Sequence, residues 1–184
     1  MGTVFEKHPT IEQCRELWNE YDTPMHIRKH CMAVAAVAYA IGRELNMHGG
    51  KLDLDLIMAA GLTHDLVRLR DRHDLECAKI MSNLGYAQEA AIIQVHMMYS
   101  SFSPISFINE TDLVCLGDRC VIEHEYVGVE KRYQYIIDKA MRNGHPEAAA
   151  KVGELKHDVI RLVGEIEEVT GKTMDEITKD IVIE

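Results

Sequence analysis

The 184-residue sequence has no apolar run that approaches the ~20 residues of a membrane span. It has no alternating apolar–polar run that would predict a sheet, and no internal repeat. Its five cysteines are odd in number, lack CxxC spacing and mostly lie in apolar rows, so we expect reduced core thiols. Residues 1–6 carry neither a secretory signal nor a myristoylation motif. These absences predict a soluble, cytoplasmic, all-α protein.

A basic stripe is also missing. The chain has 20 Lys and Arg against 30 Asp and Glu, a net charge of −10, which argues against nucleic acid as a partner. A small anionic substrate is still compatible with this charge, because a metal ion and a few arginines can set the field locally. The length favours one domain, residues 1–184, with a sizeable core.

Helical periodicity and capping residues divide the chain into short and long helices. Thr10 and Gln13 form a capping box, Asp53 is a further N-cap, and Gly171 ends the longest C-terminal helix. Ser100 to Asn109 is the longest irregular stretch, and its apolar residues predict that it packs over another part of the protein, the functional site included. The predicted helices span residues 10–21, 24–45, 53–65, 73–84, 87–99, 129–142, 146–169 and 174–181, and a further helix starts at Thr111 and contains Asp118.

His64 and Asp65 form a polar pair at the end of an almost wholly apolar stretch, residues 56–63. A run that is apolar on every side is typical of a helix buried all round. A carboxylate in such a place needs a charge partner or a metal ion. The pair therefore predicts a divalent cation, held together with His and Asp residues from other helices.

Two further residues meet this description. His30 lies one turn before Val34 on an apolar row, and Asp118 shares a row with Val114, so both should point inward. A single inward histidine is more often a hydrogen-bonded core residue than a ligand. Two imidazoles and two carboxylates on three helices instead suit Mn²⁺, Fe²⁺, Co²⁺, Ni²⁺ or Mg²⁺ rather than a zinc cage of thiolates. The predicted metal ligands are His30, His64, Asp65 and Asp118.

At these residues the chain resembles the HD-domain metal-dependent phosphohydrolases, which carry the order H…HD…D on successive helices. The resemblance covers roughly residues 21–136, and implies an all-α HD-like bundle with added C-terminal helices over 145–184. One departure is Leu66-Val67-Arg68, where many relatives have Ile-Gly-Lys or Ile-Gly-Arg; Arg68 keeps the cation.

The resemblance also implies a second metal ion in those members that hold two. His73 and His96 would ligate it, with Asp65 as the bridging ligand. Both histidines lie on inward rows, but His73 could instead cap its helix and His96 could bond to a carbonyl group. His26, one turn before His30, is either a substrate contact or an exposed helix-start residue.

The implied activity is hydrolysis of a nucleotide or another small phosphate ester or anhydride by metal-activated water. Asp65 would be both ligand and water-orienting group, and Arg68 or Arg119 would stabilise charge on the phosphoryl oxygens. Two other classes are a catalytically silent nucleotide-binding or regulatory module and a structural protein with a metal staple. An oxygenase with two irons is a further alternative.

The C-terminal half of the chain contains another His-Asp pair and a long apolar stripe on the same predicted helix. His157-Asp158 falls off the apolar stripe of its helix, which predicts a solvated surface pair without a role in metal binding. The stripe itself, which runs from Val152 to Val169, either packs on the domain or pairs with a second copy in a homodimer.

Overall fold

The computed structural model describes residues 7–181, and within them the fold is all-α, as the sequence predicts. The prediction about residues 1–6 concerns a segment outside this range. Among the described residues no helix is both long enough and apolar enough to cross a membrane. The elements are α1 (Ile11–Glu20), α2 (Met25–Met47), α3 (Leu54–Thr63), α4 (His73–Asn83), α5 (Ala87–Ile93), the short 3₁₀ helix η1 (Ile105–Phe107), α6 (Glu110–Asp118), β1 (Val121–Ile122), β2 (Glu125–Tyr126), α7 (Gly128–Arg142), α8 (Pro146–Thr170) and α9 (Met174–Thr178).

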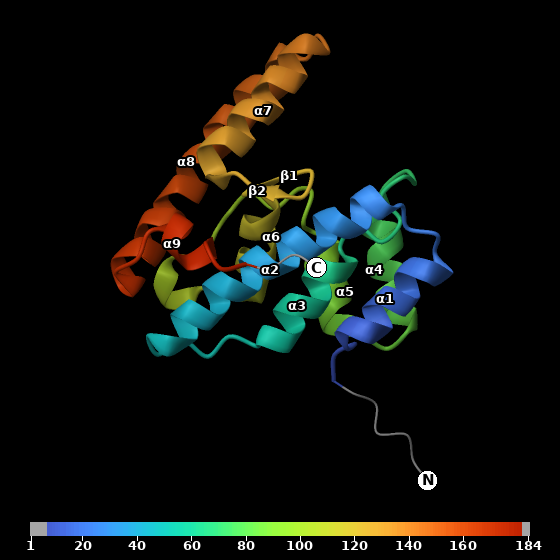
Figure 1. Ribbon diagram of the computed structural model, residues 1–184. Coiled ribbons are helices and arrows are strands. Elements are labelled where there is room, and N and C mark those ends of the chain that lie inside the picture. The colour runs from blue at the N-terminus through green and yellow to red at the C-terminus, as the bar shows by residue number, and fades with distance from the viewer. Residues whose placement is uncertain (1–6, 182–184) are drawn as a thin grey trace.

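Helix α2 forms the centre of the body, with α3 and α6 packed directly against it (Figure 1). Small side chains such as Ala35 and Ala38 line its buried faces, and glycines of the neighbouring helices meet them. A Cβ atom on Gly61 would lie 2.6 Å from Ala35 Cα, and one on Gly117 would lie 2.8 Å from the Val34 carbonyl oxygen. The helix axes can approach this closely only because both positions are glycine.

We expect Gly61→Ala to lower the free energy of unfolding by about 2–3 kcal/mol, the upper range for overpacking of a core. The added methyl group would meet the backbone of α2 rather than a flexible side chain, so α3 must move away, together with His64 at its end. Denaturant unfolding of the variant measures the loss. Gly153→Ala in α8 is the matched control, because nothing lies within 4 Å of its Cβ position; it should be neutral or slightly stabilising. Equal stability of the two variants would contradict this packing.

Helices α7 and α8 form a hairpin that extends beyond the rest of the body (Figure 1). Val159, Leu162 and Ile166, from the second half of α8, are fully buried and belong to the same apolar core as α2 and α6. The stripe of α8 is thus used for core packing in this chain, and a homodimer stays a prediction. Gly171 ends α8 in the left-handed conformation, as predicted.

The sequence gives no signal for one pair of short strands that the described residues contain. A two-stranded antiparallel hairpin joins α6 to α7, with Val121 opposite Tyr126 and Ile122 opposite Glu125. Strands of two residues are too short to produce an alternating pattern in the sequence. Glu123 makes the turn with a positive φ of 55°.

Residues 87–109 differ from the prediction at the end of α5, whereas the segment 100–109 packs over another part of the protein as predicted. Helix α5 ends at Ile93 rather than at residue 99, and turns follow it. The segment 100–109 packs mainly against α8: Asp158 accepts a hydrogen bond from the Phe102 amide at 2.6 Å, and Phe102 is buried. Asp158 also accepts from Arg161, so it is not merely solvated, although its neighbour His157 is exposed.

Candidate metal centre

The carboxyl end of α3 is held in place by side chains from the start of the chain. Asp53 caps the other end of this helix by accepting a hydrogen bond from the Leu56 amide. The Trp18 indole donates to the Leu62 carbonyl at 2.9 Å, and the Thr23 hydroxyl donates to the Leu66 carbonyl at 2.7 Å. These bonds satisfy the free carbonyl groups that a helix end leaves. They fix the backbone on both sides of His64 and Asp65.

Asp65 directs one carboxylate oxygen, Oδ2, toward His30 of α2 and His64. The distances from Oδ2 to the Nε2 atoms are 3.6 Å for His30 and 3.4 Å for His64. Asp118, at the end of α6, adjoins the group through His30, with 3.1 Å between Asp118 Oδ1 and His30 Nε2. The three members His30, His64 and Asp65 are buried, and their ligand atoms are close enough to share one ion. The structure thus brings together residues from three helices that the sequence singled out; their binding of a metal stays a prediction.

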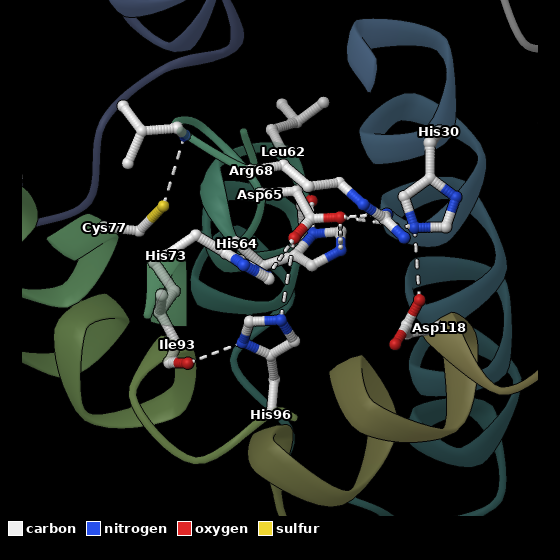
Figure 2. Close-up of polar contacts among 12 residues, drawn as sticks. His30, Leu62, His64, Asp65, Arg68, His73, Cys77, Ile93, His96 and Asp118 are labelled. Atoms are coloured by element: carbon white, nitrogen blue, oxygen red, sulfur yellow. Dashed lines mark hydrogen bonds and ion pairs between the residues drawn. The ribbon is translucent and has the colours of Figure 1, made fainter. Parts of the chain in front are cut away.

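The other oxygen of Asp65, Oδ1, faces a second pair of histidines. His73 Nε2 lies 3.0 Å from it and His96 Nε2 lies 3.6 Å from it. Figure 2 shows His73 and His96 on one side of the carboxylate and His30 with Asp118 on the other. Asp65, His73 and His96 form a second compact group of potential ligand atoms. Asp65 therefore has the geometry of a carboxylate shared by two groups, one oxygen to each.

His73 reaches Asp65 because the turn after α3 is well defined. Arg72 adopts a left-handed conformation, with φ 48° and ψ 46°, and its guanidinium forms a bidentate pair with Asp74. Helix α4 then starts at His73, so the imidazole projects from the first residue of the helix. The alternative of His73 as the helix cap is wrong, since Arg72 occupies that position and no side chain forms a cap hydrogen bond.

Backbone carbonyl groups orient three of the imidazoles. The Nδ1 atoms of His30, His64 and His96 lie 2.7, 2.8 and 2.6 Å from the carbonyl oxygens of Glu123, Gly61 and Ile93. A carbonyl oxygen only accepts, so Nδ1 carries the hydrogen in each case. In the neutral rings of His64 and His96, Nε2 then presents a lone pair toward Asp65, which is the tautomer of a metal-ligating histidine whose other nitrogen is held by the protein. His30 Nε2 instead lies within hydrogen-bond distance of Asp118 Oδ1. The predicted alternative for His96, a hydrogen bond to a carbonyl, thus coexists with a free Nε2.

The pKa values of His64 and Asp118 depend on the charged groups beside them. Burial opposes charge on His64, but the adjacent Asp65 carboxylate outweighs it and holds the pKa of His64 well above its usual value. Burial would raise the pKa of Asp118, but the hydrogen bond and charge of His30 hold that pKa well below its usual value. Without a metal ion, a proton on His64 offsets the charge of the adjacent Asp65 carboxylate. A cation that binds here displaces this proton, so its affinity should fall as the pH falls.

The buried polar atoms fit a cation between them. Among residues 7–181, His64 Nε2 and Asp65 Oδ1 are fully buried without a hydrogen-bond partner, because even the close approach of His73 lacks hydrogen-bond geometry. Unpaired buried polar atoms cost free energy unless another group, such as an ion, satisfies them. The donor set of imidazole nitrogens and carboxylate oxygens is one that first-row divalent metals accept. The residues therefore fit a divalent metal in both groups.

A cavity of about 900 Å³ opens beside the first group. Arg68 lies at its inner end and donates to Asp65, although its side chain is 41% exposed. Arg132 of α7 lies in the same wall, with Nη2 3.9 Å from Asp118 Oδ1, and its buried Nε has no partner among the described residues. Arg132 was not among the residues predicted for the site, because α7 lies outside the H…HD…D order. Its signal was the row Arg132, Tyr135, Ile136 and Lys139, all of which line the cavity.

Arg119 does not have the place that the sequence predicted for it. Its guanidinium donates to the backbone carbonyls of Cys115 and Tyr99, at 2.9 and 2.6 Å, and lies 5.4 Å from the centre of the Phe102 ring. Because these contacts occupy its donors, Arg119 holds the segment after His96 rather than a phosphoryl oxygen. His26, by contrast, is exposed at the cavity wall, which fits both of its alternatives, a substrate contact and an exposed helix-start residue.

Comparison with known proteins agrees with this geometry. A family model described as HD domain matches residues 27–161, and the chain belongs to the HD-domain family. It is also similar to an uncharacterized protein, MJ0778, of Methanocaldococcus jannaschii, with 31% identity over 71 residues. That similarity covers 37% of this chain and 42% of the relative, so the chain spans less than half the length of the relative that it matches. No solved structure matches the chain.

Proposed function

We propose that the protein is a metal-dependent phosphohydrolase that acts on a nucleotide or another small phosphate ester or anhydride. The observation that carries the proposal is the pair of His and Asp groups that share Asp65 and adjoin a cavity with cationic side chains. A phosphorylated substrate matches this combination, because its phosphoryl oxygens can reach a metal and the arginines together.

Each residue has a distinct role in the proposed reaction. His30, His64, Asp65 and Asp118 would hold one divalent ion, and His73 and His96 would hold a second ion with Asp65. When bound, such an ion lowers the pKa of a coordinated water molecule and polarises a phosphoryl oxygen. The side chain of Arg68 is partly exposed to solvent. Its guanidinium can therefore donate to a phosphoryl oxygen of the substrate in place of the Asp65 carboxylate.

Arg132 would bind the same phosphoryl group together with Arg68, since both side chains line the cavity. Its Nε–H is buried without an acceptor, and a phosphoryl oxygen would supply one. Asp118, already close to Arg132, keeps the guanidinium near the ion-binding groups before substrate arrives. Asp65 is the group best placed to orient the attacking water, since its carboxylate lies between the two groups of histidines.

The two other classes make different demands on the site. A metal staple has a closed ligand shell and no adjoining cavity, whereas His30 and Arg68 both line an open one. A silent nucleotide-binding module has no need for a full set of His and Asp ligands, and this chain retains His30, His64, Asp65 and Asp118. The silent module is nevertheless the stronger alternative, because its binding cavity would be the same.

A phosphate-release screen tests the proposal. We expect purified protein with Mn²⁺, Co²⁺ or Mg²⁺ to release phosphate from at least one nucleotide or aryl phosphate, and a chelator to abolish the release until metal is restored. Calorimetry on the same compounds separates the alternatives. Nucleotide binding without any release of phosphate would replace the enzyme by a binding module.

A further inference from the structure

We propose that the outer half of the cavity binds a second anionic group, so that the substrate is a phosphate ester with a flat apolar part and a further acidic group beyond it. This inference rests on the proposed function and specifies its substrate. Lys139 of α7 is the residue that would contact the second anion.

Helix α7 leads along the cavity from its inner to its outer end. Arg132, Tyr135, Ile136 and Lys139 are spaced i, i+3, i+4 and i+7, so they form one row along the helix, and all four line the cavity. Seven residues of α helix rise about 10 Å. Arg132 is close to Asp118 at the ion-binding groups, and Lys139 therefore lies about two turns farther out. Figure 1 shows α7 leaving the body in this direction.

The side chains that line the cavity are mostly cationic among the charged ones. The cavity wall contains four Lys and Arg side chains but one acidic residue, Glu123, in a chain whose net charge is −10. Arg68 and Arg132 are balanced by the carboxylates of Asp65 and Asp118. Lys139 of α7 and Lys29 of α2 have no ion-pair partner within residues 7–181. Binding of metal and phosphoryl group at the centre leaves these two lysines unused, and they favour an additional negative charge in the outer cavity.

Apolar and aromatic side chains lie between the two cationic ends of the cavity. Tyr135 and Ile136 occupy the row between Arg132 and Lys139, and Met25 and Leu69 add apolar surface to the cavity. The Arg132 guanidinium lies 5.9 Å from the centre of the Tyr135 ring, so this ring is positioned beside the inner cation. An extended polyphosphate chain would place charges against this apolar surface. A flat apolar group between two anions matches it better.

Two non-hydrolysable compounds of almost equal shape test the inference. 4-Carboxybenzylphosphonate carries a second anion across a ring from its phosphonate, and 4-nitrobenzylphosphonate carries a neutral nitro group at the same place. We expect the metal-loaded protein to bind the carboxy compound about tenfold more tightly in calorimetry, the effect of one charge-assisted contact. Lys139→Gln should remove this preference and change the affinity for the nitro compound less than about twofold, whereas Lys139→Arg should keep it.

Lys131→Gln is the matched control, since it makes the same change on the same helix outside the cavity lining. It should preserve the tenfold preference. Equal binding of the two compounds by the parent protein, or an equal loss for both in Lys139→Gln, would overturn the inference. Release of 4-nitrophenol from 4-nitrophenyl phosphate is recorded separately. Its absence would remove the proposed hydrolase activity, while the phosphonate affinities would still decide the role of Lys139.

Discussion

Asp65→Asn is expected to lose metal from both groups and to reduce hydrolysis by more than about a hundredfold. This loss is larger than the usual loss of activity when a residue that only hydrogen-bonds to a metal ligand is replaced. Asparagine keeps the size of the side chain but removes its charge and replaces one oxygen by an amide nitrogen, which cannot ligate as a carboxylate does. Oδ2 faces His30 and His64 while Oδ1 faces His73 and His96, so the substitution affects both groups at once.

Metal content by plasma emission, measured beside phosphate release, checks this result. Asp71→Asn is the control. Asp71 is exposed in the turn after α3, so this variant makes the same chemical change outside the cluster. It should retain parental metal content and activity. Parental metal stoichiometry in Asp65→Asn would show that the cluster is not the metal centre. A melting curve by circular dichroism confirms that each variant is folded.

His73→Ala and His96→Ala should each retain one ion and lose most turnover. Both histidines approach only Oδ1 of Asp65, so their removal leaves His30, His64, Asp65 and Asp118 intact as a first site. If the reaction uses two ions, loss of the second removes one of the two charges that stabilise the transition state. His30→Ala serves as the complementary variant and should deplete the first site instead.

His157→Ala is the control for these variants, since His157 is an exposed histidine that also precedes an aspartate. It should leave metal content and turnover at the parental values. The parent protein, loaded with iron or manganese, should contain two ions per chain. A parent with one ion, together with full occupancy in His73→Ala and His96→Ala, would leave a mononuclear enzyme in which both histidines are core residues.

Local sequence patterns predicted the inward faces of individual helices. His30 and Asp118 could be assigned to the interior because each shares a helical row with apolar residues, and a row has a definite direction once the helix exists. Capping was equally local: Thr10 with Gln13, Asp53 and Gly171 occupy their predicted positions. Such features depend on residues a few positions apart, whose relative geometry the backbone fixes.

The contacts between elements could not be predicted in this way. Glu123 supplies the carbonyl that orients His30 from a hairpin too short to have a pattern, and Arg132 approaches Asp118 from a helix outside the family order. Arg119 and Asp158 were assigned from their own helices, one to substrate and one to solvent, yet both anchor the segment around Phe102. Their partners lie far away in the chain, and only packing brings these partners near.

The sequence by itself determined the all-α class, the helices that carry the His and Asp ligands, and the family order H…HD…D. The tertiary structure decided that the two oxygens of Asp65 face different histidine pairs, that His73 reaches the carboxylate through the turn at Arg72, and that the cationic cavity follows α7. The physical reason is that periodicity specifies which side of a helix is buried, whereas the distance and angle between side chains depend on how closely the helices pack. Gly61 and Gly117 set that packing against α2.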